Sequence, residues 1–442
     1  MITLDQLRGL VDTIVVVMME NRSFDHMLGF LSHEAFDARQ DIDGLRQPTS
    51  DFDLSNPDAA GRLFAPTATP DGYLPTDLPH SRTQIASELR GGAMDGFITT
   101  YQASQDLDKT AVPMRFNRPV DIPITAALAR NYTVCDHWFA AVPADTQPNR
   151  MMALSGETLI DATPGSLTLF KAEHTVLDWL ASKSLDFKIY VDAKSILDVG
   201  PPSNLLLMPS QWGHVLAHGE PLDGLAEPWK SDAPAPKFIY CEPFYNDFAT
   251  VLGQHGTCNH PPLPVGYGED FLRRVYETLT SNPKKWGRTV LIVCYDEHGG
   301  FFDHVAPPHM TYAPPPGNKW TQQVPFTTLG VRIPGIVVSP LVAAGSSSHL
   351  LFDHTSILQL VVDRFGAQAD LGFFGQALAR KANRTNPVQS LGSTLTLSAP
   401  RNDILTGLVS PVVHTGAATT PPISELGMLF RQVLAAKPAK QP

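Results

Sequence analysis

The sequence predicts an α/β fold in which a mainly parallel central β-sheet lies between helices. Two apolar runs rich in β-branched residues, at 13–19 and 289–295, are typical of strands buried on both faces of such a sheet. Each run leads directly into acidic and polar side chains. Because open α/β sheets bind ligands just beyond the carboxyl ends of their strands, these polar segments are candidates for a functional site.

The segment after the second predicted strand opens with Asp296, Glu297 and His298, and two glycines follow. Adjacent carboxylates at the end of a buried strand need a compensating charge, and a divalent cation is the expected partner. The alternative is a polar turn with exposed acids. Paired glycines before two aromatic residues, however, better suit a backbone that bends tightly around a site.

The first predicted strand delivers Glu20 and Asn21 to the same region. Together with the acidic pair at 296–297, their carboxylate and amide oxygens would form a hard, oxygen-rich cation site. The same segment could instead cap the next helix through Asn21 or Ser23. We expect Glu20 and Asn21 to be ligands, because they come first after the strand, and Ser23 and Asp25 to be capping and supporting residues.

A third segment, residues 135–150, precedes an apolar stretch. Pro148 is favoured near a helix start, so Thr146 and Gln147 are predicted to lie on the loop before a helix, where backbone N–H groups attract a phosphate. A cation-coordinated Thr146 hydroxyl could ionise and attack phosphorus, and Arg150 could contribute charge to phosphoryl oxygens. Taken alone, Thr146 fits an ordinary helix N-cap better; the two other segments favour the catalytic interpretation.

These three segments together resemble the bacterial phospholipase C and acid phosphatase A family of phosphoesterases, which includes plant non-specific phospholipases C. The resemblance extends from about residue 11 to about residue 366. It implies a fold related to alkaline phosphatases and sulfatases. Further matching positions are His80 and the segments 94–97, 260–262, 330–335 and 353–356.

The resemblance implies a role for each matching residue. A divalent metal ion would be bound by Glu20, Asn21, Asp296, Glu297 and the hydroxyl of Thr146, which would also be the nucleophile. In the same scheme, His80 and His260 would stabilise phosphoryl oxygens or protonate the leaving group.

Several of these roles have alternatives. A histidine before two prolines, as at His260, also suits a structured turn. Arg150, His298 and His354 are predicted to contact the phosphate. His298, with Asp303 and His304, could instead bind a second ion, although a supporting role behind the first ligands is favoured. His354 equally suits the start of a helix.

The implied reaction is a two-step displacement through a covalent phospho-threonine, which water then hydrolyses. We expect a metal-dependent phosphoester hydrolase of the phospholipase C type, cleaving phosphodiesters such as phosphatidylcholine. An acid phosphatase-like monoesterase on the same site is the alternative. A non-catalytic binding relative is disfavoured by the intact ligand set, and a sulfatase is disfavoured because Thr146 cannot become formylglycine.

The predicted partners are one cation and a small phosphoester or phospholipid head group. The ligand set fits calcium, magnesium or manganese, and related folds also use zinc. A choline head group would need an aromatic or acidic cage, although aromatic residues in a large domain usually lie in the core. The candidates for such a cage are Trp138, Tyr245, Trp286 and Trp320.

The 442 residues are expected to form a catalytic domain over 1–366 and a C-terminal extension over 367–442, which packs on it and ends in a disordered tail. The 39 prolines and 32 glycines are spread through long connections, notably 47–79 and 306–325. We expect these connections to lie as loops over the active-site face. Within the extension, 391–397 suggests a strand and 425–436 a short helix.

Charge and composition limit the partners and the location. The formal net charge of −11 argues against nucleic acid, and no apolar stretch has transmembrane length, so contact with lipid would be transient. Residues 1–10 carry no visible export signal, which favours a cytoplasmic location; the resemblance leaves a secreted or periplasmic one open. Four scattered cysteines form no disulfide framework, and a Cys241–Cys258 bridge remains an alternative.

Overall fold

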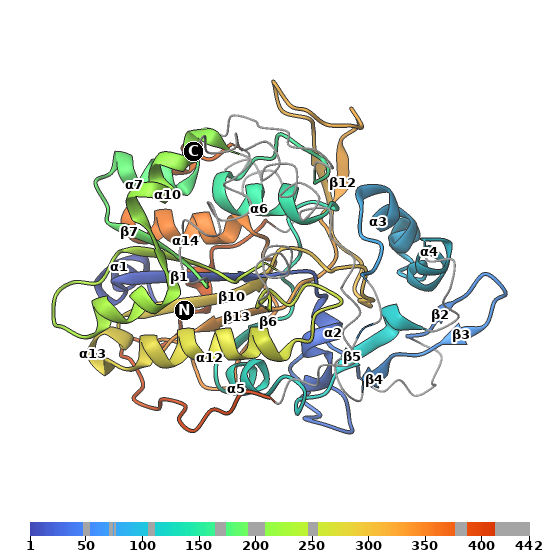
Figure 1. Cartoon of the computed structure of the whole chain (residues 1–442), viewed down its shortest axis with the longest axis horizontal. Helices are drawn as coiled ribbons and strands as arrows, with labels where there is room; N and C mark the ends of the chain where they lie inside the picture. The colour runs from blue at the N-terminus through green and yellow to red at the C-terminus, as the bar shows by residue number, and fades with distance from the viewer. Residues whose placement is uncertain are drawn as a thin grey trace, which may run out of the picture.

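An eight-stranded sheet forms the centre of the computed structural model, in the order β14-β6-β13-β10-β1-β9-β7-β8 (Figure 1). The structure describes residues 1–46, 54–69, 74, 77–104, 111–163, 174–192, 208–245, 255–375 and 387–411. The strands of this sheet are β1 (Thr13–Met19), β6 (Thr133–Cys135), β7 (Phe187–Val191), β8 (Gly219–Pro221), β9 (Phe238–Glu242), β10 (Thr289–Tyr295), β13 (Gly335–Val338) and β14 (Ser347–Ser348).

The two strands predicted from apolar runs, β1 and β10, are parallel neighbours at the centre of the sheet. Their register runs from Thr13 opposite Thr289 to Met19 opposite Tyr295, and every residue of both strands is buried. The other neighbouring pairs are also parallel, except that β13 runs antiparallel to β10 and to β6. The predicted fold class, a mainly parallel sheet between helices, is confirmed.

Helices cover both faces of this sheet (Figure 1). One layer contains α1 (Leu4–Leu10), α6 (Thr146–Ser155), α7 (Val176–Ser182), α10 (Trp212–His218) and α14 (Thr355–Phe365). The opposite layer contains α5 (Pro123–Asn131), α12 (Gly266–Thr280) and α13 (Pro283–Trp286). Helix α12 turns Phe271, Leu272, Val275 and Leu279 inward, which is the spacing of one apolar helix face.

A smaller group of elements lies beyond the carboxyl ends of β1 and β10, on the right of Figure 1. It contains α2 (Phe24–Leu28), α3 (Arg82–Leu89), α4 (Phe97–Ser104), β2 (Asn56–Pro57), β3 (Leu63–Phe64), β4 (Thr67–Thr69) and β5 (Arg115–Asn117). The pair β11 (His309–Tyr312) and β12 (Phe326–Thr328) forms another small sheet. The predicted loop over 47–79 therefore contains the short strands β2, β3 and β4, and the one over 306–325 contains β11.

In the C-terminal part, the prediction of a strand at 391–397 is wrong. Leu391–Thr394 is a 3₁₀ helix and not a strand, because the Ser390 side chain accepts a hydrogen bond from the Gly392 N–H (3.1 Å) and turns the chain. The helix predicted at 425–436 and the tail lie outside the described residues. Helix α14 ends at Phe365 with Gly366 as its C-cap, and the domain boundary at this point remains a prediction.

Two further expectations concern cysteines and membranes. All four cysteines are buried and unbridged, so the alternative of a Cys241–Cys258 disulfide is wrong. Among the residues that the structure describes, no helix combines the length and the apolar character needed to cross a bilayer.

Candidate active site

The carboxyl ends of β1 and β10 bring the four predicted cation ligands together. The Asn21 N–H donates to Oδ1 of Asp296 (3.0 Å), and the Arg22 N–H donates to the carbonyl of Glu297 (3.0 Å). Two segments 275 residues apart are thus hydrogen bonded side by side. Glu20 is only 3% exposed, and Asn21, Asp296 and Glu297 are fully buried.

The close approach of these segments depends on Gly299. Asn21 has a φ of 56° and Gly299 a φ of 65°, both in the left-handed region. A Cβ on Gly299 would lie 2.1 Å from the Asn21 carbonyl oxygen, which no side chain tolerates. The prediction that the glycines let the backbone bend tightly around the site is therefore confirmed for Gly299.

Thr146 is the first residue of α6, and its hydroxyl reaches the same place. Its Oγ1 donates to Oδ1 of Asn21 at 3.4 Å, and the residue is 8% exposed. Asp145, with extended backbone, is the N-cap, so the predictions that Thr146 lies on the preceding loop or acts as the N-cap are wrong. The nearby N–H groups of the first helical turn still favour an anion here.

Arg150 lies one turn further along α6 and is completely buried. Its Nε is 3.1 Å from Oδ2 of Asp296, and its terminal nitrogens are 3.1 Å from Oε2 of Glu242 and 3.5 Å from Oε1 of Glu20. The guanidinium is therefore engaged by carboxylates. These contacts favour compensation of buried negative charge over the predicted phosphate contact, which stays a prediction.

One arginine does not balance the negative charge around it. Burial, helped by the neighbouring Asp296 charge, raises the pKa of Glu20 to about 8 against the opposing effect of Arg150. Burial also raises the pKa of Glu242 to about 7. Among the described residues, Oε1 of the buried Glu297 has no hydrogen-bond partner. An all-oxygen cluster with surplus negative charge and an unsatisfied carboxylate oxygen fits a hard divalent cation.

His298 supports this cluster from behind. Its Nε2 lies 2.9 Å from Oε2 of Glu88, and its Nδ1 lies 3.2 Å from Oε2 of Glu297. Burial alone would lower the pKa of His298, but the two carboxylates outweigh it and raise the pKa to about 9. Both ring nitrogens face acids, which favours the supporting role over a phosphate contact or a ligand to a second ion.

His354 joins the loop before α6 to the end of β10. Its Nδ1 accepts from the Ala141 N–H (3.1 Å), and its Nε2–H donates to the Tyr295 carbonyl (2.9 Å). The ring is fully buried, and the residue is the N-cap of α14. This arrangement favours the predicted helix start over a phosphate contact.

Asp303 and His304, the alternative ligands of a second ion, lie beside the positively charged side chain of Arg332. Buried Arg332 donates from Nε to Asp303 (2.8 Å) and from a terminal nitrogen to Asp25 (3.2 Å). His304 Nδ1 lies 2.7 Å from Oδ2 of Asp25. Arg332 and His304 thus form an ion-pair network with Asp25 and Asp303, which favours a supporting role over binding of a second ion. Asp25 supports it as predicted, and Ser23 caps α2 through the His26 N–H (3.1 Å).

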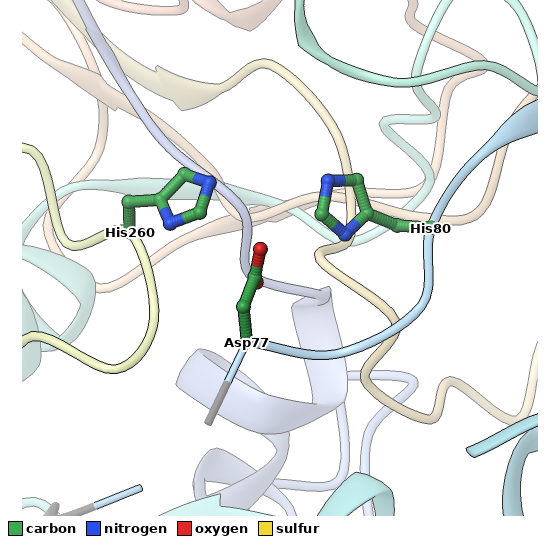
Figure 2. A group of neighbouring side chains, drawn as sticks. All are labelled: Asp77, His80 and His260. Carbon is green, nitrogen blue, oxygen red and sulfur yellow. The ribbon is translucent and has the colours of Figure 1, made fainter. Parts of the chain in front are cut away.

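His80 and His260 face each other across the site, with Asp77 between them (Figure 2). The two ring centroids are 6.2 Å apart. His80 Nε2 lies 3.2 Å from Nδ2 of Asn21, so this group adjoins the cluster at the strand ends. Each ring makes an Nδ1 contact of 2.6 Å to a backbone carbonyl, of Leu78 for His80 and of Pro261 for His260.

The four aromatic residues considered for a choline cage are core residues. Trp138 packs against Phe352, with ring centroids 6.0 Å apart. Tyr245 lies 5.1 Å from the guanidinium of Arg150. All four are at most 5% exposed, and they belong to two separate hydrophobic clusters, one with Trp138, Tyr245 and Trp286 and the other with Trp320.

Three acids of this region were not predicted from the sequence: Asp77, Glu88 and Glu242. Glu242 ends β9, a neighbour of β1, so it follows the pattern of an acid at the end of an apolar strand and could have been found. Asp77 lies before α3 and Glu88 lies on it. No local pattern in the sequence predicts that either residue lies near the site.

The chain is similar to known phosphoesterases. The family model described as "Phosphoesterase family" matches residues 11–368. Non-specific phospholipase C6 of Arabidopsis thaliana is 29% identical over 373 residues, covering 78% of this chain and 66% of the plant protein. The chain thus spans about two thirds of that relative. Phospholipase C B of Mycobacterium tuberculosis is 29% identical over 444 residues, covering 89% of this chain and 79% of the relative.

The similarity to solved structures is weak. A protein in the alkaline phosphatase superfamily from Vibrio parahaemolyticus has a TM-score of 0.32 and 13% identity, with 72% of each chain covered. The phosphonate monoester hydrolase of Agrobacterium radiobacter has a TM-score of 0.35 and 10% identity, with 82% of this chain and 77% of that chain covered. Scores this low say nothing about the site.

Proposed function

The chain belongs to the phosphoesterase family, and we propose that it cleaves phospholipid-type phosphodiesters through a covalent intermediate on Thr146. Family membership confirms the predicted resemblance and the predicted class, a hydrolase acting on phosphoester bonds. The observation that carries the proposed mechanism is the position of the Thr146 hydroxyl, 3.4 Å from Asn21 Oδ1 and beside the acids at the ends of β1 and β10.

In this proposal Glu20, Asn21, Asp296 and Glu297 hold one divalent cation, with Thr146 as the fifth ligand. The surplus of carboxylates and the unsatisfied Oε1 of Glu297 support this. When bound, the cation would favour ionisation of the Thr146 hydroxyl and stabilise charge on the phosphoryl group. Arg150 and His298 keep the carboxylates in place, since each contacts two or more of the surrounding acids.

The reaction would proceed in two displacements. Thr146 Oγ1 bonds to phosphorus, the bond to the leaving alcohol breaks, and the alcohol oxygen takes up a proton. Water then attacks phosphorus, the bond to Oγ1 breaks, and the hydroxyl of Thr146 regains a proton. His80 and His260 remain the predicted groups that stabilise phosphoryl oxygens or transfer the proton, because they face the site from separate segments (Figure 2).

A diester with an apolar leaving group is the favoured substrate class. A cavity of about 560 Å³ lies between α3 and the β11–β12 pair, lined by Arg82, Leu89, Pro143, Pro307 and Phe326 among others. Two of its lining residues, Pro143 and Arg82, lie three residues before Thr146 and two residues after His80 in the sequence. Its largely apolar lining suits the diacylglycerol part of a phospholipid. The names of the similar plant and bacterial proteins, all phospholipases C, support the same class.

The test compares p-nitrophenyl phosphorylcholine, a diester, with p-nitrophenyl phosphate, a monoester. We expect a preference for the diester, lost on chelation and restored by adding a divalent cation. Thr146→Ala should lower kcat by at least about 10³-fold with an unchanged thermal midpoint, and Thr146→Ser should retain turnover. A preference for the monoester would favour the acid phosphatase alternative. An undiminished rate in Thr146→Ala would remove the proposed nucleophile.

A further inference from the structure

We propose that Arg22 is the positioning residue of His260: its guanidinium holds the segment 259–263, which carries His260, against the carboxyl end of β1. The inference rests on the proposed function, because it takes from there the part of His260 in the transfer of the phosphoryl group to Thr146. Arg22 directly follows Glu20 and Asn21 in the chain, but its side chain contacts this different segment.

The Arg22 side chain is hydrogen bonded to both ends of the segment. Its Nε donates to the Asn259 carbonyl (2.8 Å), and a terminal nitrogen donates to the Leu263 carbonyl (3.3 Å). Asn259 directly precedes His260, and Leu263 follows it by three residues. Because the donors of a guanidinium are fixed in one plane, a single side chain sets the position of both ends at once.

The other contacts of the guanidinium are also with uncharged groups. Its second terminal nitrogen lies 3.0 Å from Nε2 of His26, whose Nδ1–H donates to the Arg115 carbonyl (2.7 Å). Burial and the charge of Arg22 lower the pKa of His26 well below its ordinary value, so the ring is neutral and its Nε2 accepts. The Phe301 ring lies 5.0 Å from the guanidinium carbon.

Arg22 differs in this respect from Arg150 and Arg332, which are buried as completely. Each of those two arginines contacts at least two carboxylates. Among the residues that the structure describes, no carboxylate forms an ion pair with Arg22, although the charge of Asp77 acts on it from further away. Since a buried cation without an ion pair is costly, compensation of a contacting acid does not account for Arg22, whereas its hold on 259–263 does.

The backbone of this segment is strained directly before His260. Asn259 has a φ of 73°, in the left-handed region that a residue with a side chain keeps only when its surroundings enforce it. Two further contacts help Arg22 to enforce it. The Asn259 Nδ2 donates to the Tyr295 hydroxyl at the end of β10 (2.8 Å), and the Glu20 N–H donates to the Cys258 carbonyl (2.8 Å).

The imidazole of His260 follows the position of this segment. Its Nδ1 lies 2.6 Å from the Pro261 carbonyl, and the His260 carbonyl accepts from the Leu263 N–H (3.0 Å). Ring and backbone are thus hydrogen bonded within 260–263. Figure 2 shows the ring projecting from its own stretch of chain toward His80. The place of the ring at the site therefore depends on what fixes the whole segment, and Arg22 joins that segment to the end of β1.

A double-mutant cycle in the full-length chain tests whether Arg22 acts through His260. Arg22→Lys keeps the charge and loses the planar set of donors. With p-nitrophenyl phosphorylcholine we expect Arg22→Lys to lower kcat by up to about 10²-fold with little change in KM, the cost of a misplaced catalytic group. In the His260→Gln background the same change should cost almost nothing further. Losses that add in the double variant would overturn the proposal.

Two variants control for folding. Arg22→Gln leaves no buried carboxylate without its partner, so it should fold and behave like Arg22→Lys. In the part of the chain that the structure describes, Arg332 donates no hydrogen bond to 259–263. The effect of Arg332→Lys on kcat should therefore add to that of His260→Gln. If Arg332→Lys also had no effect in the His260→Gln background, the coupling to Arg22 would not be specific and the proposal would fail.

Hydrogen exchange separates this inference from the proposed function, because it needs no substrate. Peptides that cover 259–263 should exchange faster in Arg22→Lys than in the unmodified chain and in Arg332→Lys. Unchanged exchange in Arg22→Lys would overturn the proposal, whatever the activity. If the unmodified chain cleaves no phosphodiester, the proposed function fails, and the exchange of 259–263 decides by itself whether Arg22 holds His260 in place.

Discussion

The Nε atom of Arg150 lies 3.1 Å from Oδ2 of Asp296, and neither side chain is exposed to solvent. This contact joins α6, which begins with the proposed nucleophile, to the segment that follows β10. Thr146 and Arg150 are four residues apart on the helix, so they lie on one face of it. The arginine therefore fixes the position of the nucleophile relative to the acids while it balances part of their charge.

Replacing Arg150 by methionine should strongly destabilise the fold. The change leaves Glu20, Glu242 and Asp296 buried without their shared cation, and removing one partner of a buried ion pair costs about 3–5 kcal/mol. Urea unfolding measures the loss. The control is Arg273→Met, whose partly exposed ion pairs with Asp270 and Glu277 predict a cost of about 0–1 kcal/mol. Equal losses in the two variants would contradict the compensating role of Arg150.

Hard divalent cations should stabilise the folded chain. A cation that binds only the native state at about 100 times its Kd adds about 2.7 kcal/mol to the free energy of unfolding. We expect the thermal midpoint to rise when magnesium, calcium or manganese is added to chelator-treated protein, and to stay constant in Glu297→Gln. Glu277→Gln, which changes a carboxylate far from the site, should respond like the unmodified chain. A cation response that survives in Glu297→Gln would place the binding elsewhere.

The ion-pair network around His304 should make stability depend on pH. Burial lowers the pKa of His304, but Asp25 and Asp43 outweigh it and raise the pKa to about 10, against 6.5 for an ordinary histidine. A raised histidine pKa contributes stability that is complete below about pH 6.5 and is lost as pH rises toward about 10. The difference in unfolding free energy between the unmodified chain and His304→Gln should therefore shrink over that interval.

Urea unfolding at several pH values between about 6 and about 10 measures this difference in unfolding free energy. His255→Gln, a change at an exposed histidine, is the control and should show no comparable trend. A difference between the unmodified chain and His304→Gln that stays constant, or grows with pH, would show that His304 is not held in its charged form by these acids.

The sequence predicted the elements whose signals are local. The strands ending before Glu20 and Asp296 were predictable because a continuous apolar, β-branched run of seven residues suits a buried strand far better than an exposed loop. The shared pattern of an acid directly after the strand predicted that both strands end at one region, and the structure shows that they are direct neighbours. The start of α6 at Thr146 was misplaced, because Pro148 suits any position in the first helical turn and not only the first one.

Partnerships between distant side chains could not be predicted from the sequence. Arg150 has the composition of a phosphate contact, and only the fold shows that it is surrounded by acids from β9 and from the ends of β1 and β10. Asp77 lies in a connection rich in proline and polar residues, where nothing distinguishes it from a solvated acid. Such residues acquire their role from the packing of segments that are far apart in the chain.

Gly299→Ala should disrupt the cation site more than an alanine substitution that imposes a similar backbone strain elsewhere in the chain. The alanine Cβ would lie 2.1 Å from the Asn21 carbonyl oxygen, so the ends of β1 and β10 must separate and the ligands with them. Gly317 is a matched control: its φ of 73° imposes a similar backbone strain on alanine, about 1–2 kcal/mol, but no atom lies within 4 Å of its added Cβ. We expect Gly317→Ala to lose some stability and keep full cation affinity and turnover. Gly299→Ala should lose cation affinity and turnover, which are measured by calorimetric titration with manganese and by the diester assay. Equal cation affinity in the two variants would show that the close approach at Asn21 does not position the ligands.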